Sequence, residues 1–445
     1  MKRIVILGSG ESGTGAAILA KRNGFDVFVS DRGKIADAYK AELAAFEIDF
    51  EEGEHTESKI LNASEIIKSP GIPEKSPLIK QLRAAGIPII SEIEFAYRYK
   101  GDSKIVGITG SNGKSTTTSL LYHICQVAGI DSALVGNIGY SIARQVALDP
   151  KEYYITEISS FQLDDIVDFK ADIAILLNIT EDHLDRYDYK FENYIASKFK
   201  IVKNQKEDDY FIYNEDDPVI VKYMKQYLPH SILLPFTMKN EVRQGAYIKD
   251  EKMLIKFKEE QWNMNVNDFT IIGKHNQSNS MAAGIAASVM NIRSDKTRDA
   301  VTTFSALEHR LQKVLTIKGV DYINDSKSTN VNSTWFALEC IDKKVVLILG
   351  GVDKGNDYSI LDELVEEKVK AIVCLGVDNS LIHDHFDGMV DTIVDTSNMD
   401  DCIKACYSLA EQGDVVLLSP SCASFDLFKN FEDRGEQFIA AVKGL

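Results

Sequence analysis

Long apolar runs are missing from this sequence of 445 residues. No hydrophobic stretch approaches the roughly 20 residues that a membrane-spanning helix needs, so we expect no membrane segment. The first residues, MKRIVILG, lead directly into a strand-like run. A secretory signal would carry a longer apolar region and a small-residue cleavage site, so we expect none.

A surplus of basic charge is also missing. Asp and Glu total 67 against 50 Lys and Arg, which gives a formal net charge of -17. Nucleic-acid binding depends on basic surface that neutralises phosphates, so we expect no nucleic-acid partner. A local positive pocket for a nucleotide remains compatible with this composition.

Paired cysteine motifs are absent as well. The six cysteines form no CxxC motif, and several lie in apolar stretches, which predicts buried thiols in the reducing cytoplasm. Cys402 and Cys406 lie four residues apart and could share a helix face as metal ligands. They lack a second ligand pair, however, and a metal site normally needs one.

Strand and helix patterns alternate in three blocks, 1–100, 101–304 and 305–445. Such alternation is typical of α/β proteins with parallel sheets, and the length fits two to four domains. We expect Rossmann-like first and third domains and a central P-loop ATPase-type domain with a mostly parallel sheet. The alternating stretch AYIKDEKMLIKF predicts a small antiparallel addition to that central sheet.

A first glycine-rich loop, GSGESG, follows the strand-like RIVIL. It matches G-x-G-x-x-G, and Asp31 ends the second strand about 20 residues later, as in dinucleotide-binding folds. The glycines would let the backbone approach a diphosphate at a helix N-terminus. The pattern fits an NAD enzyme, another diphosphate nucleotide, or a tight turn without a ligand.

A second glycine-rich loop, GITGSNGKSTT, follows the strand-like Lys104-Ile105-Val106. It is a variant of the Walker A motif, because the first motif glycine would fall on Ile108. Successive backbone N–H groups can still form an anion nest, and Lys114 adds a point charge. Ser115 or Thr116 can offer a hydroxyl to Mg²⁺, so we expect a phosphate site here, rather than a glycine-rich turn that merely carries a lysine.

Polar residues stand where central strands end. Glu157 ends an apolar strand, and Asn178 is followed closely by His183. Metal ligands of phosphoryl-transfer enzymes are expected at this edge of the sheet, although a solvated loop would also explain the second group. Lys198 lies on the apolar stripe of a predicted helix, where a free cation is costly. It must snorkel, pair, lose its proton or be modified.

These motifs together resemble the ATP-dependent Mur ligase family of peptidoglycan synthesis. The matching segments run in order along nearly the whole chain. They are GITGSNGKST, GNIG, EISSFQL, NITEDHLDRY, the lysine at 198, GKHNQSN, HR at 309–310, DSKSTN, LGG and SPSCASFDLFKNFEDRGEQF. The DSKSTN and C-terminal segments are most similar to the family members that add D-glutamate. The resemblance implies ATP-driven amide ligation through an acyl phosphate and a tetrahedral intermediate.

The resemblance also implies roles for particular residues. The implied ATP-binding residues are Gly110, Ser111, Asn112, Gly113, Lys114, Ser115, Thr116, Asn276, Asn279, Arg310 and Asp325. The implied catalytic residues are Lys114, Glu157, His183 and Lys198. The implied ligands of two Mg²⁺ ions are Ser115, Glu157, His183 and Lys198, the last as a carbamate formed with CO₂. Carbamylation needs a neutral amine, which burial favours.

Under the same resemblance the first loop binds UDP rather than NAD. The residues implied for the UDP-substrate are Gly10, Ser12, Gly13, Asp31, Arg32, Gly71 and Asn137. Those implied for the incoming amino acid are Lys327, Thr329, Lys354, Ser424 and Phe431. Glu11 would put a carboxylate beside the diphosphate, so its side chain must turn away or the UDP placement is imperfect. The expected substrates are UDP-N-acetylmuramoyl-L-alanine, D-glutamate and ATP, and we expect a monomer.

Three other functions compete with this interpretation. A sibling ligase could add another amino acid or extend folate with glutamate, although the Asp-Asn-Pro-Arg signature of the diaminopimelate-adding sibling is absent. An NAD-dependent oxidoreductase would use the first loop and leave the second without a purpose. A P-loop motor would hydrolyse ATP without either of the other two substrates.

Overall fold

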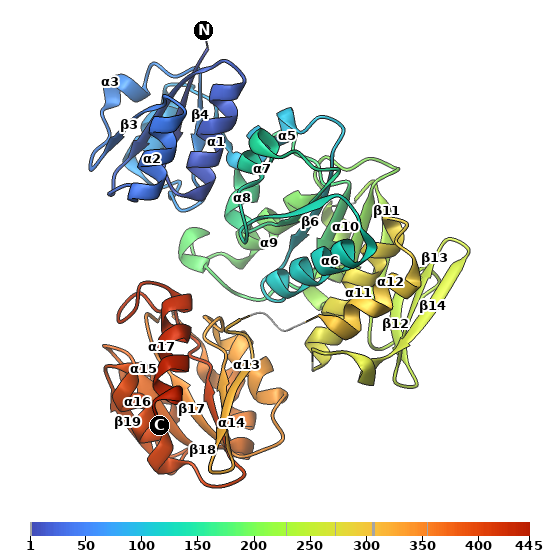
Figure 1. Ribbon diagram of the computed structural model, residues 1–445, viewed down its shortest axis with the longest axis vertical. Helices are drawn as coiled ribbons and strands as arrows, with labels where there is room; N and C mark the ends of the chain where they lie inside the picture. The colour runs from blue at the N-terminus through green and yellow to red at the C-terminus, as the bar shows by residue number, and fades with distance from the viewer. Residues whose placement is uncertain (1, 228, 272, 305–307, 354) are drawn as a thin grey trace. The chain divides into compact units, whose positions relative to one another are not determined.

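The computed structural model describes residues 2–227, 229–271, 273–304, 308–353 and 355–445. The chain divides into two compact units (Figure 1). Unit 1 comprises Met1–Phe269 and Gln277–Phe304, and unit 2 comprises Thr270–Asn276 and Ser305–Leu445. The described residues form three sheets with helices against them, which is the α/β architecture expected from the alternating pattern.

The first sheet has the strand order β3-β2-β1-β4-β5, and all its strands are parallel. Its strands are β1 (Arg3–Leu7), β2 (Asp26–Asp31), β3 (Asp49–Glu52), β4 (Glu65–Lys68) and β5 (Ile89–Ser91). Its helices are α1 (Glu11–Arg22), α2 (Asp37–Ala45), α3 (Glu57–Ile60), α4 (Pro77–Ala84) and α5 (Glu92–Tyr99). The order reverses between β1 and β4, and ligands of open parallel sheets bind at the carboxyl ends of the strands at such a point.

The second sheet has the order β14-β13-β12-β11-β10-β9-β6-β8-β7. Its strands are β6 (Lys104–Thr109), β7 (Ser132–Gly136), β8 (Tyr153–Glu157), β9 (Ile173–Leu176), β10 (Tyr210–Asn214), β11 (Ile232–Thr237), β12 (Gly245–Lys249), β13 (Lys252–Phe257) and β14 (Glu260–Asn265). Only the pairs β12–β13 and β13–β14 are antiparallel among the described pairings of this sheet, which confirms the predicted antiparallel addition. On β13 every second side chain is buried, as a sheet with one covered face requires.

Helices of the central region accompany this sheet. They are α6 (Lys114–Ala128), α7 (Ile142–Leu148), α8 (Ser160–Asp164), α9 (Phe191–Phe199), α10 (Pro218–Tyr227), α11 (Lys274–Val289) and α12 (Ser294–Thr303), with the 3-10 turns η1 (Leu184–Arg186), η2 (Lys200–Val202) and η3 (Val266–Asp268). Helix α1 packs on α7, and one hydrophobic cluster continues from the first sheet into the second, which explains why both belong to unit 1.

The third sheet, in unit 2, has the order β15-β16-β20-β17-β18-β19. Its strands are β15 (Gln312–Ile317), β16 (Val320–Asn324), β17 (Val345–Leu349), β18 (Val369–Leu375), β19 (Ile393–Thr396) and β20 (Val415–Leu418). Its helices are α13 (Val331–Glu339), α14 (Asp362–Lys368), α15 (Ser380–Phe386), α16 (Met399–Leu409) and α17 (Phe431–Lys443), with the 3-10 turn η4 (Tyr358–Leu361). Separate hydrophobic clusters fill its two faces, so the central strands β17, β18 and β20 are buried on both sides, whereas the edge strands β15 and β19 are not.

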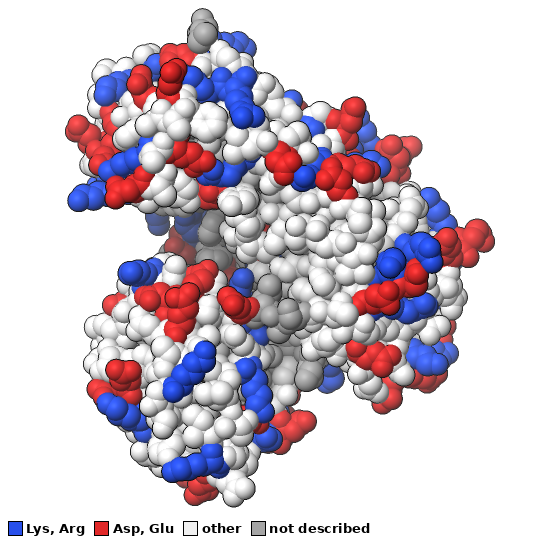
Figure 2. Space-filling view, viewed as in Figure 1, with Lys and Arg blue, Asp and Glu red and all other residues white. Residues whose placement is uncertain are grey.

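Acidic and basic side chains are intermingled on the face seen in Figure 2. Within the described part of the chain, no helix is both long and apolar enough to cross a bilayer.

Candidate active site

The turn between β6 and α6 carries the second glycine-rich loop. Gly110 and Gly113 have φ angles of 156° and 81°, in the region that favours glycine. A Cβ atom at Gly113 would lie 2.4 Å from Oδ1 of Asn279, so that side chain lies directly against the loop. Ser115 and Thr116 are buried in the first turn of α6. The structure therefore brings Asn279 to the predicted phosphate-binding loop.

Two lysines converge on this loop. Nζ of Lys114 donates to the carbonyl oxygens of Gly110 and Ser111, at 2.9 and 2.8 Å. Nζ of Lys198, from α9, donates to the same Gly110 oxygen at 2.7 Å. The Lys198 side chain is fully buried and lies 4.5 Å from the ring centroid of Tyr194.

The electrostatic surroundings of Lys198 favour its neutral form. Burial lowers the pKa of Lys198 well below its usual range, and the charge of Lys114 lowers it further. The carboxylates of Asp182 and Glu157 act in the opposite direction. Lys198 thus occupies the buried position predicted from the helix periodicity, where a charged amine is costly. Its pKa is lower than that of a surface lysine.

Glu157 ends β8 at the same edge of the sheet. Its Oε1 accepts a hydrogen bond of 2.8 Å from Nδ2 of Asn137. Its Oε2 is buried and has no hydrogen-bond partner among the described residues. A buried carboxylate oxygen without a donor is costly unless a cation or a ligand satisfies it. The donor set of this edge therefore fits Mg²⁺, which prefers oxygen ligands.

His183 lies in the loop that follows β9, with a left-handed φ of 53°. Its Nε2 is 3.6 Å from Oδ2 of Asp182, and its ring centroid is 5.0 Å from that of Phe161. The side chain keeps 36% of its surface exposed. It is thus much less enclosed than Glu157 or Lys198, and it can reorient toward a ligand.

Sequence reasoning did not assign a role to Asn178, which holds the loop in place. Its Oδ1 accepts from the backbone N–H of Asn112 at 2.8 Å, and its Nδ2 donates to the Asn112 carbonyl at 3.0 Å. The hydroxyl of Ser111 lies 3.1 Å from that of Tyr194 and donates to the carbonyl of Thr180. The available signal was the position of Asn178 just after a strand that neighbours β6.

A pocket of about 870 Å³ lies at the carboxyl ends of the first sheet. Five predicted UDP-substrate residues line it: Gly10, Ser12, Asp31, Arg32 and Gly71. Gly13 lies behind the loop, where a Cβ atom would meet the Gly8 carbonyl oxygen at 1.9 Å. Asn137 is not among the lining residues and contacts Glu157 instead. His55, which the sequence did not single out, lines the pocket and lies 2.7 Å from the hydroxyl of Ser30.

Glu11 also lines this pocket, and its carboxylate is paired with Arg144. Its Oε1 accepts from Nε of Arg144 at 2.6 Å and from the backbone N–H of Ser141 at 2.9 Å. Its Oε2 accepts from a second nitrogen of Arg144 at 2.9 Å. This bidentate pair gives the Glu11 carboxylate a counter-charge beside the predicted diphosphate site. Asp31, for its part, accepts from the N–H and hydroxyl of Ser9 at 2.7 and 2.8 Å, so it shapes the loop.

Arg186, in η1, connects the loop after β9 with the pocket. Its guanidinium donates to the carbonyl oxygens of Pro70 and Gly71 at 3.0 and 3.1 Å. It also stacks over the ring of Phe161, 4.4 Å from the centroid. No local sequence pattern indicates this long-range contact.

In unit 2, Asp325 is fully enclosed just after β16. Its Oδ2 accepts from the hydroxyls of Ser328 and Ser419, the latter at 2.9 Å. Burial raises the pKa of Asp325, while the charge of Arg310 lowers it. Nε of Arg310 is buried without a hydrogen-bond partner among the described residues. Such a guanidinium is suited to an anionic ligand.

Asn276 lies in the short segment of unit 2 at the start of α11. It is buried, and its backbone N–H donates to the Gly273 carbonyl at 3.0 Å. The adjacent His275 has its pKa lowered to about 4, first by burial and then by the charge of Arg310.

The residues predicted for the amino acid are only partly brought together. Nζ of Lys327 lies 5.3 Å from the ring centroid of Phe431. Ser424 is buried and Thr329 is half-buried. Lys354 lies outside the described residues.

Arg434 is a residue that the sequence did not reveal. It is buried on α17 and donates to Ser326 and to the Cys422 carbonyl. It thereby joins the two loops that carry Lys327 and Ser424.

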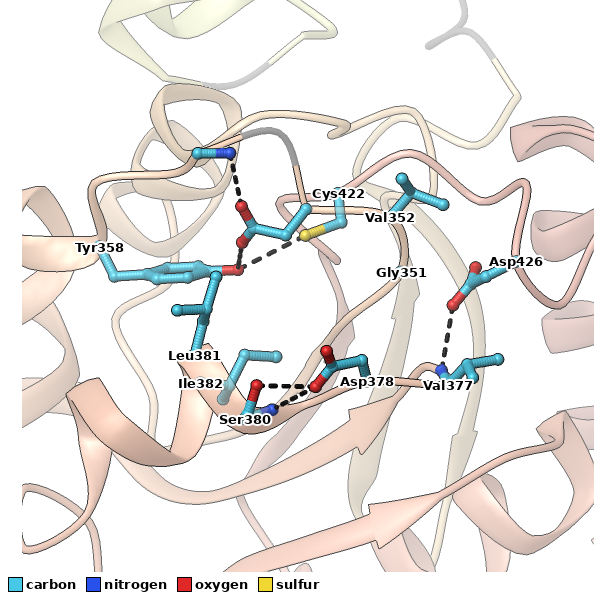
Figure 3. Close-up of a pocket in the computed structure, with 12 residues that line it drawn as sticks. Gly351, Val352, Tyr358, Val377, Asp378, Ser380, Leu381, Ile382, Cys422 and Asp426 are labelled. Carbon is cyan, nitrogen blue, oxygen red and sulfur yellow. Dashed lines mark hydrogen bonds between the residues drawn. The ribbon is translucent and has the colours of Figure 1, made fainter.

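Figure 3 shows a pocket of unit 2, of about 420 Å³. Its lining includes three carboxylates, Asp353, Asp378 and Asp426. None of the described residues predicted for the amino acid is among its lining residues. Its charge is unsuited to a dicarboxylic amino acid.

Family models match three successive parts of the chain. The Mur ligase MurD-like N-terminal domain matches residues 2–91, the Mur ligase middle domain matches 108–287, and the Mur ligase glutamate ligase domain matches 309–422. These ranges follow the order of the three sheets. The predicted boundaries at 100 and 304 stay predictions.

Similar proteins cover the chain from end to end. The UDP-N-acetylmuramoylalanine--D-glutamate ligase of Christiangramia forsetii is 52% identical, and the match covers 100% of this chain and 100% of the relative. The enzyme of the same name from Porphyromonas gingivalis is also 52% identical, and that match covers 99% of this chain and 98% of the relative. The crystal structure of UDP-N-acetylmuramate-alanine ligase from Thermotoga maritima matches with a TM-score of 0.62, at 16% identity and over 100% of both chains. This last likeness concerns the fold. The chain therefore belongs to the Mur ligase family, as its motifs predicted.

Proposed function

We propose that this protein joins D-glutamate to UDP-N-acetylmuramoyl-L-alanine at the expense of ATP, a step of peptidoglycan synthesis. The observation that carries the proposal is the identity of 52% over the full length to enzymes named for this reaction. The glycine-rich loop with Lys114, and the Glu157 oxygen that has no hydrogen-bond partner among the described residues, support phosphoryl transfer as the chemistry.

The chemistry explains why ATP is needed. A carboxylate cannot be attacked directly by an amine, since an oxide ion would have to leave. A carboxylate oxygen of the UDP-substrate attacks the γ-phosphorus and ADP leaves, which gives an acyl phosphate. The amine of D-glutamate then attacks the acyl carbon, and the tetrahedral intermediate collapses with loss of phosphate and a proton.

Residues of the central domain would hold ATP and its metal. The loop Gly110–Gly113 would cradle phosphate oxygens with backbone N–H groups, and Lys114 would leave its carbonyl acceptors to contact them. Ser115 and Oε2 of Glu157 would hold Mg²⁺, which supplies charge neutralisation at the transferred phosphoryl group when bound. Asn279 of unit 1, and Asn276, Arg310 and Asp325 of unit 2, are the further proposed ATP contacts.

A carbamate on Lys198 is the second part of this proposal. Burial and the low pKa of the amine support its reaction with CO₂, in which nitrogen bonds to carbon and a proton is released. The product would be an anionic oxygen ligand, and with His183 it would serve a second Mg²⁺ ion. The modification would also exchange a buried neutral amine for a metal ligand.

The remaining predicted residues would bind the other substrates. Gly10, Ser12, Gly13, Asp31, Arg32 and Gly71 would surround UDP, and Asn137 would contact the sugar-peptide beside Glu157. Lys327, Thr329, Lys354, Ser424 and Phe431 would hold D-glutamate. The lining of the N-terminal pocket supports the first group. We further propose a cytoplasmic monomer, which light scattering of the purified protein would test.

An amino-acid panel tests the function. Phosphate release from ATP is measured with UDP-N-acetylmuramoyl-L-alanine and D-glutamate, L-glutamate, L-alanine or L-lysine. We expect release only with D-glutamate, and only when all substrates are present. A preference for L-glutamate would instead identify a sibling activity, and release without substrates would identify an ATPase. Lys114→Ala should abolish ligation.

A further inference from the structure

Three potential metal ligands of different types meet in unit 2, and none of them is a residue proposed for the ligase reaction. Cys374 lies on β18 and Asp395 on β19, and the two are paired in register on these adjacent parallel strands. Residues paired in this way present their side chains to the same face of a sheet. Helix α15 lies against that face and carries His383.

The donor atoms are close enough for one ion. One ligand atom from each of Cys374, His383 and Asp395 lies within 4.8 Å of the other two. Nε2 of His383 is 3.1 and 3.2 Å from the two carboxylate oxygens of Asp395. Two ligands of a tetrahedral zinc ion, with bonds of about 2.0–2.1 Å, are separated by about 3.3 Å. The imidazole and carboxylate therefore already have the spacing of two tetrahedral ligands, and the sulfur lies within 4.8 Å of both.

Neighbouring residues hold these ligands in position. Nδ2 of Asn379 donates to Oδ1 of Asp395 at 2.9 Å, and Oδ1 of Asn379 is buried without a hydrogen-bond partner among the described residues. The hydroxyl of Thr396 donates to the Cys374 carbonyl at 2.6 Å, which ties the two strands together beside the sulfur. Outer partners of this kind fix the orientation of metal ligands.

The surroundings also favour a cation and give it a path of entry. An open pocket of about 720 Å³ has His383 and Asp395 in its wall. Three further carboxylates line it, those of Asp378, Asp384 and Asp401. An ion could thus arrive from solvent, and water could take the position that the three protein ligands leave open.

We propose that Cys374, His383 and Asp395 form a binding site for a divalent transition-metal ion of the zinc class. A thiolate with an imidazole selects such an ion over Mg²⁺ or Ca²⁺, which prefer oxygen ligands. Binding replaces the thiol proton, which passes to solvent, by a sulfur–metal bond. The competing interpretation is a surface ion pair, His383 with Asp395, beside a cysteine of the hydrophobic core.

The bound metal would stabilise the loop between β18 and α15 and would take no part in the ligase reaction. Val377, Asp378 and Ser380 line both this open pocket and the pocket of Figure 3. A metal that fixes β18, β19 and α15 would hold the connection between β18 and α15. The proposal is therefore a structural site, and it does not depend on the proposed ligase activity.

Cobalt titration of the untagged, reduced full-length protein tests the proposal. Saturating Mg²⁺ is present, so that oxygen-rich sites are occupied. We expect a near-ultraviolet sulfur-to-cobalt band that saturates at one equivalent and is displaced by zinc. Cys374→Ser should remove the band, and His383→Gln and Asp395→Asn should weaken binding at least tenfold.

Matched variants test whether the band arises from these three ligands. His385→Gln changes a histidine of the same helix that pairs with Asp362 at 2.7 Å, and it should leave the band unchanged. Cys402→Ser should also leave it unchanged. Cys374→Ala is a second variant in case the serine form does not fold, and circular dichroism without metal checks each variant. Absence of the band in the wild type, or an unchanged band in His383→Gln, would overturn the proposal.

Discussion

Lys114 and Lys198 donate to one acceptor, the carbonyl oxygen of Gly110, at 2.9 and 2.7 Å. Lys114 has a second acceptor in the Ser111 carbonyl, whereas Lys198 is enclosed beside the ring of Tyr194. Burial and the neighbouring charge both lower the pKa of Lys198. The pair thus places the lysine proposed to bind phosphate next to the amine proposed to react with CO₂.

Lys198→Met tests the role of that amine. The variant removes a buried nitrogen but keeps an apolar side chain of similar length, so we expect the fold to persist. Ligation should fall by about 10²-fold or more, the usual cost of losing a group that stabilises charge in the transition state. The carbamate signal of protein equilibrated with isotope-labelled bicarbonate, followed by nuclear magnetic resonance, should disappear.

Lys200→Met is the matched control, because Lys200 lies two positions further along and donates to Asp164. It should keep both the activity and the carbamate signal. Absence of the carbamate signal in the wild-type protein would contradict the carbamate proposal. It would not contradict phosphoryl transfer, which Lys114→Ala tests separately.

Glu157→Gln should separate activity from stability. The variant keeps an oxygen that can accept from Asn137, but it removes the charge of a carboxylate whose Oε2 has no partner among the described residues. We expect the Mg²⁺ requirement to rise and kcat to fall by about 10²-fold, while the free energy of unfolding stays equal or increases. Urea unfolding and Mg²⁺ titration of phosphate release measure the two effects. A loss of stability that accompanies the loss of activity would indicate a structural role for Glu157. The control Glu152→Gln, at an exposed position, should change neither activity nor stability.

Arg144→Gln should weaken binding of the UDP-substrate. Without its bidentate partner, the Glu11 carboxylate keeps only the hydrogen bond from the Ser141 N–H and loses its counter-charge, so it would repel a diphosphate in the pocket that it lines. We expect KM for the UDP-substrate to rise about tenfold, equivalent to about 1.4 kcal/mol, and KM for ATP to stay unchanged. The double variant Glu11→Gln, Arg144→Gln should recover part of the loss. A rise in both KM values would point to general disruption instead.

Glu92 should make stability depend on pH. It is fully buried, its Oε1 accepts from the Ala143 N–H at 2.6 Å, and burial raises its pKa from 4.5 to about 8. Between these two values the unfolded chain loses the proton and the folded chain keeps it. The free energy of unfolding should therefore be highest below pH 4.5 with respect to this group, and fall as the pH rises toward about 8.

The slope contributed by Glu92 is at most about 1.4 kcal/mol per pH unit. Glu92→Gln should remove it, because an amide does not titrate. Urea unfolding at several pH values measures how the free energy of unfolding depends on pH in the wild type and in Glu92→Gln. Glu47→Gln, at an exposed position, is the control. Parallel pH profiles for Glu92→Gln and the wild type would contradict this prediction.

Local sequence patterns were sufficient for much of this fold. The apolar runs of β1, β6 and β8 predicted parallel strands because strands buried on both faces need β-branched and aliphatic residues throughout. Short or polar strands such as β3, with the sequence DFEE, carry no such signal and were not predicted. The two glycine loops and the position of Lys198 on an apolar helix face were also predictable, since dihedral angles and helix periodicity are local properties.

The contacts that shape the candidate site were decided by the tertiary structure. Glu11 meets Arg144 across 133 positions of sequence, and Lys198 meets Gly110 across 88. Asn137 and Glu157 share a hydrogen bond because β7 and β8 are neighbours in the sheet. The sequence alone determined which residues could bind phosphate, metal and UDP. Strand order and helix packing decided which of them face each other, because a charge or a hydrogen bond acts only over a few ångströms.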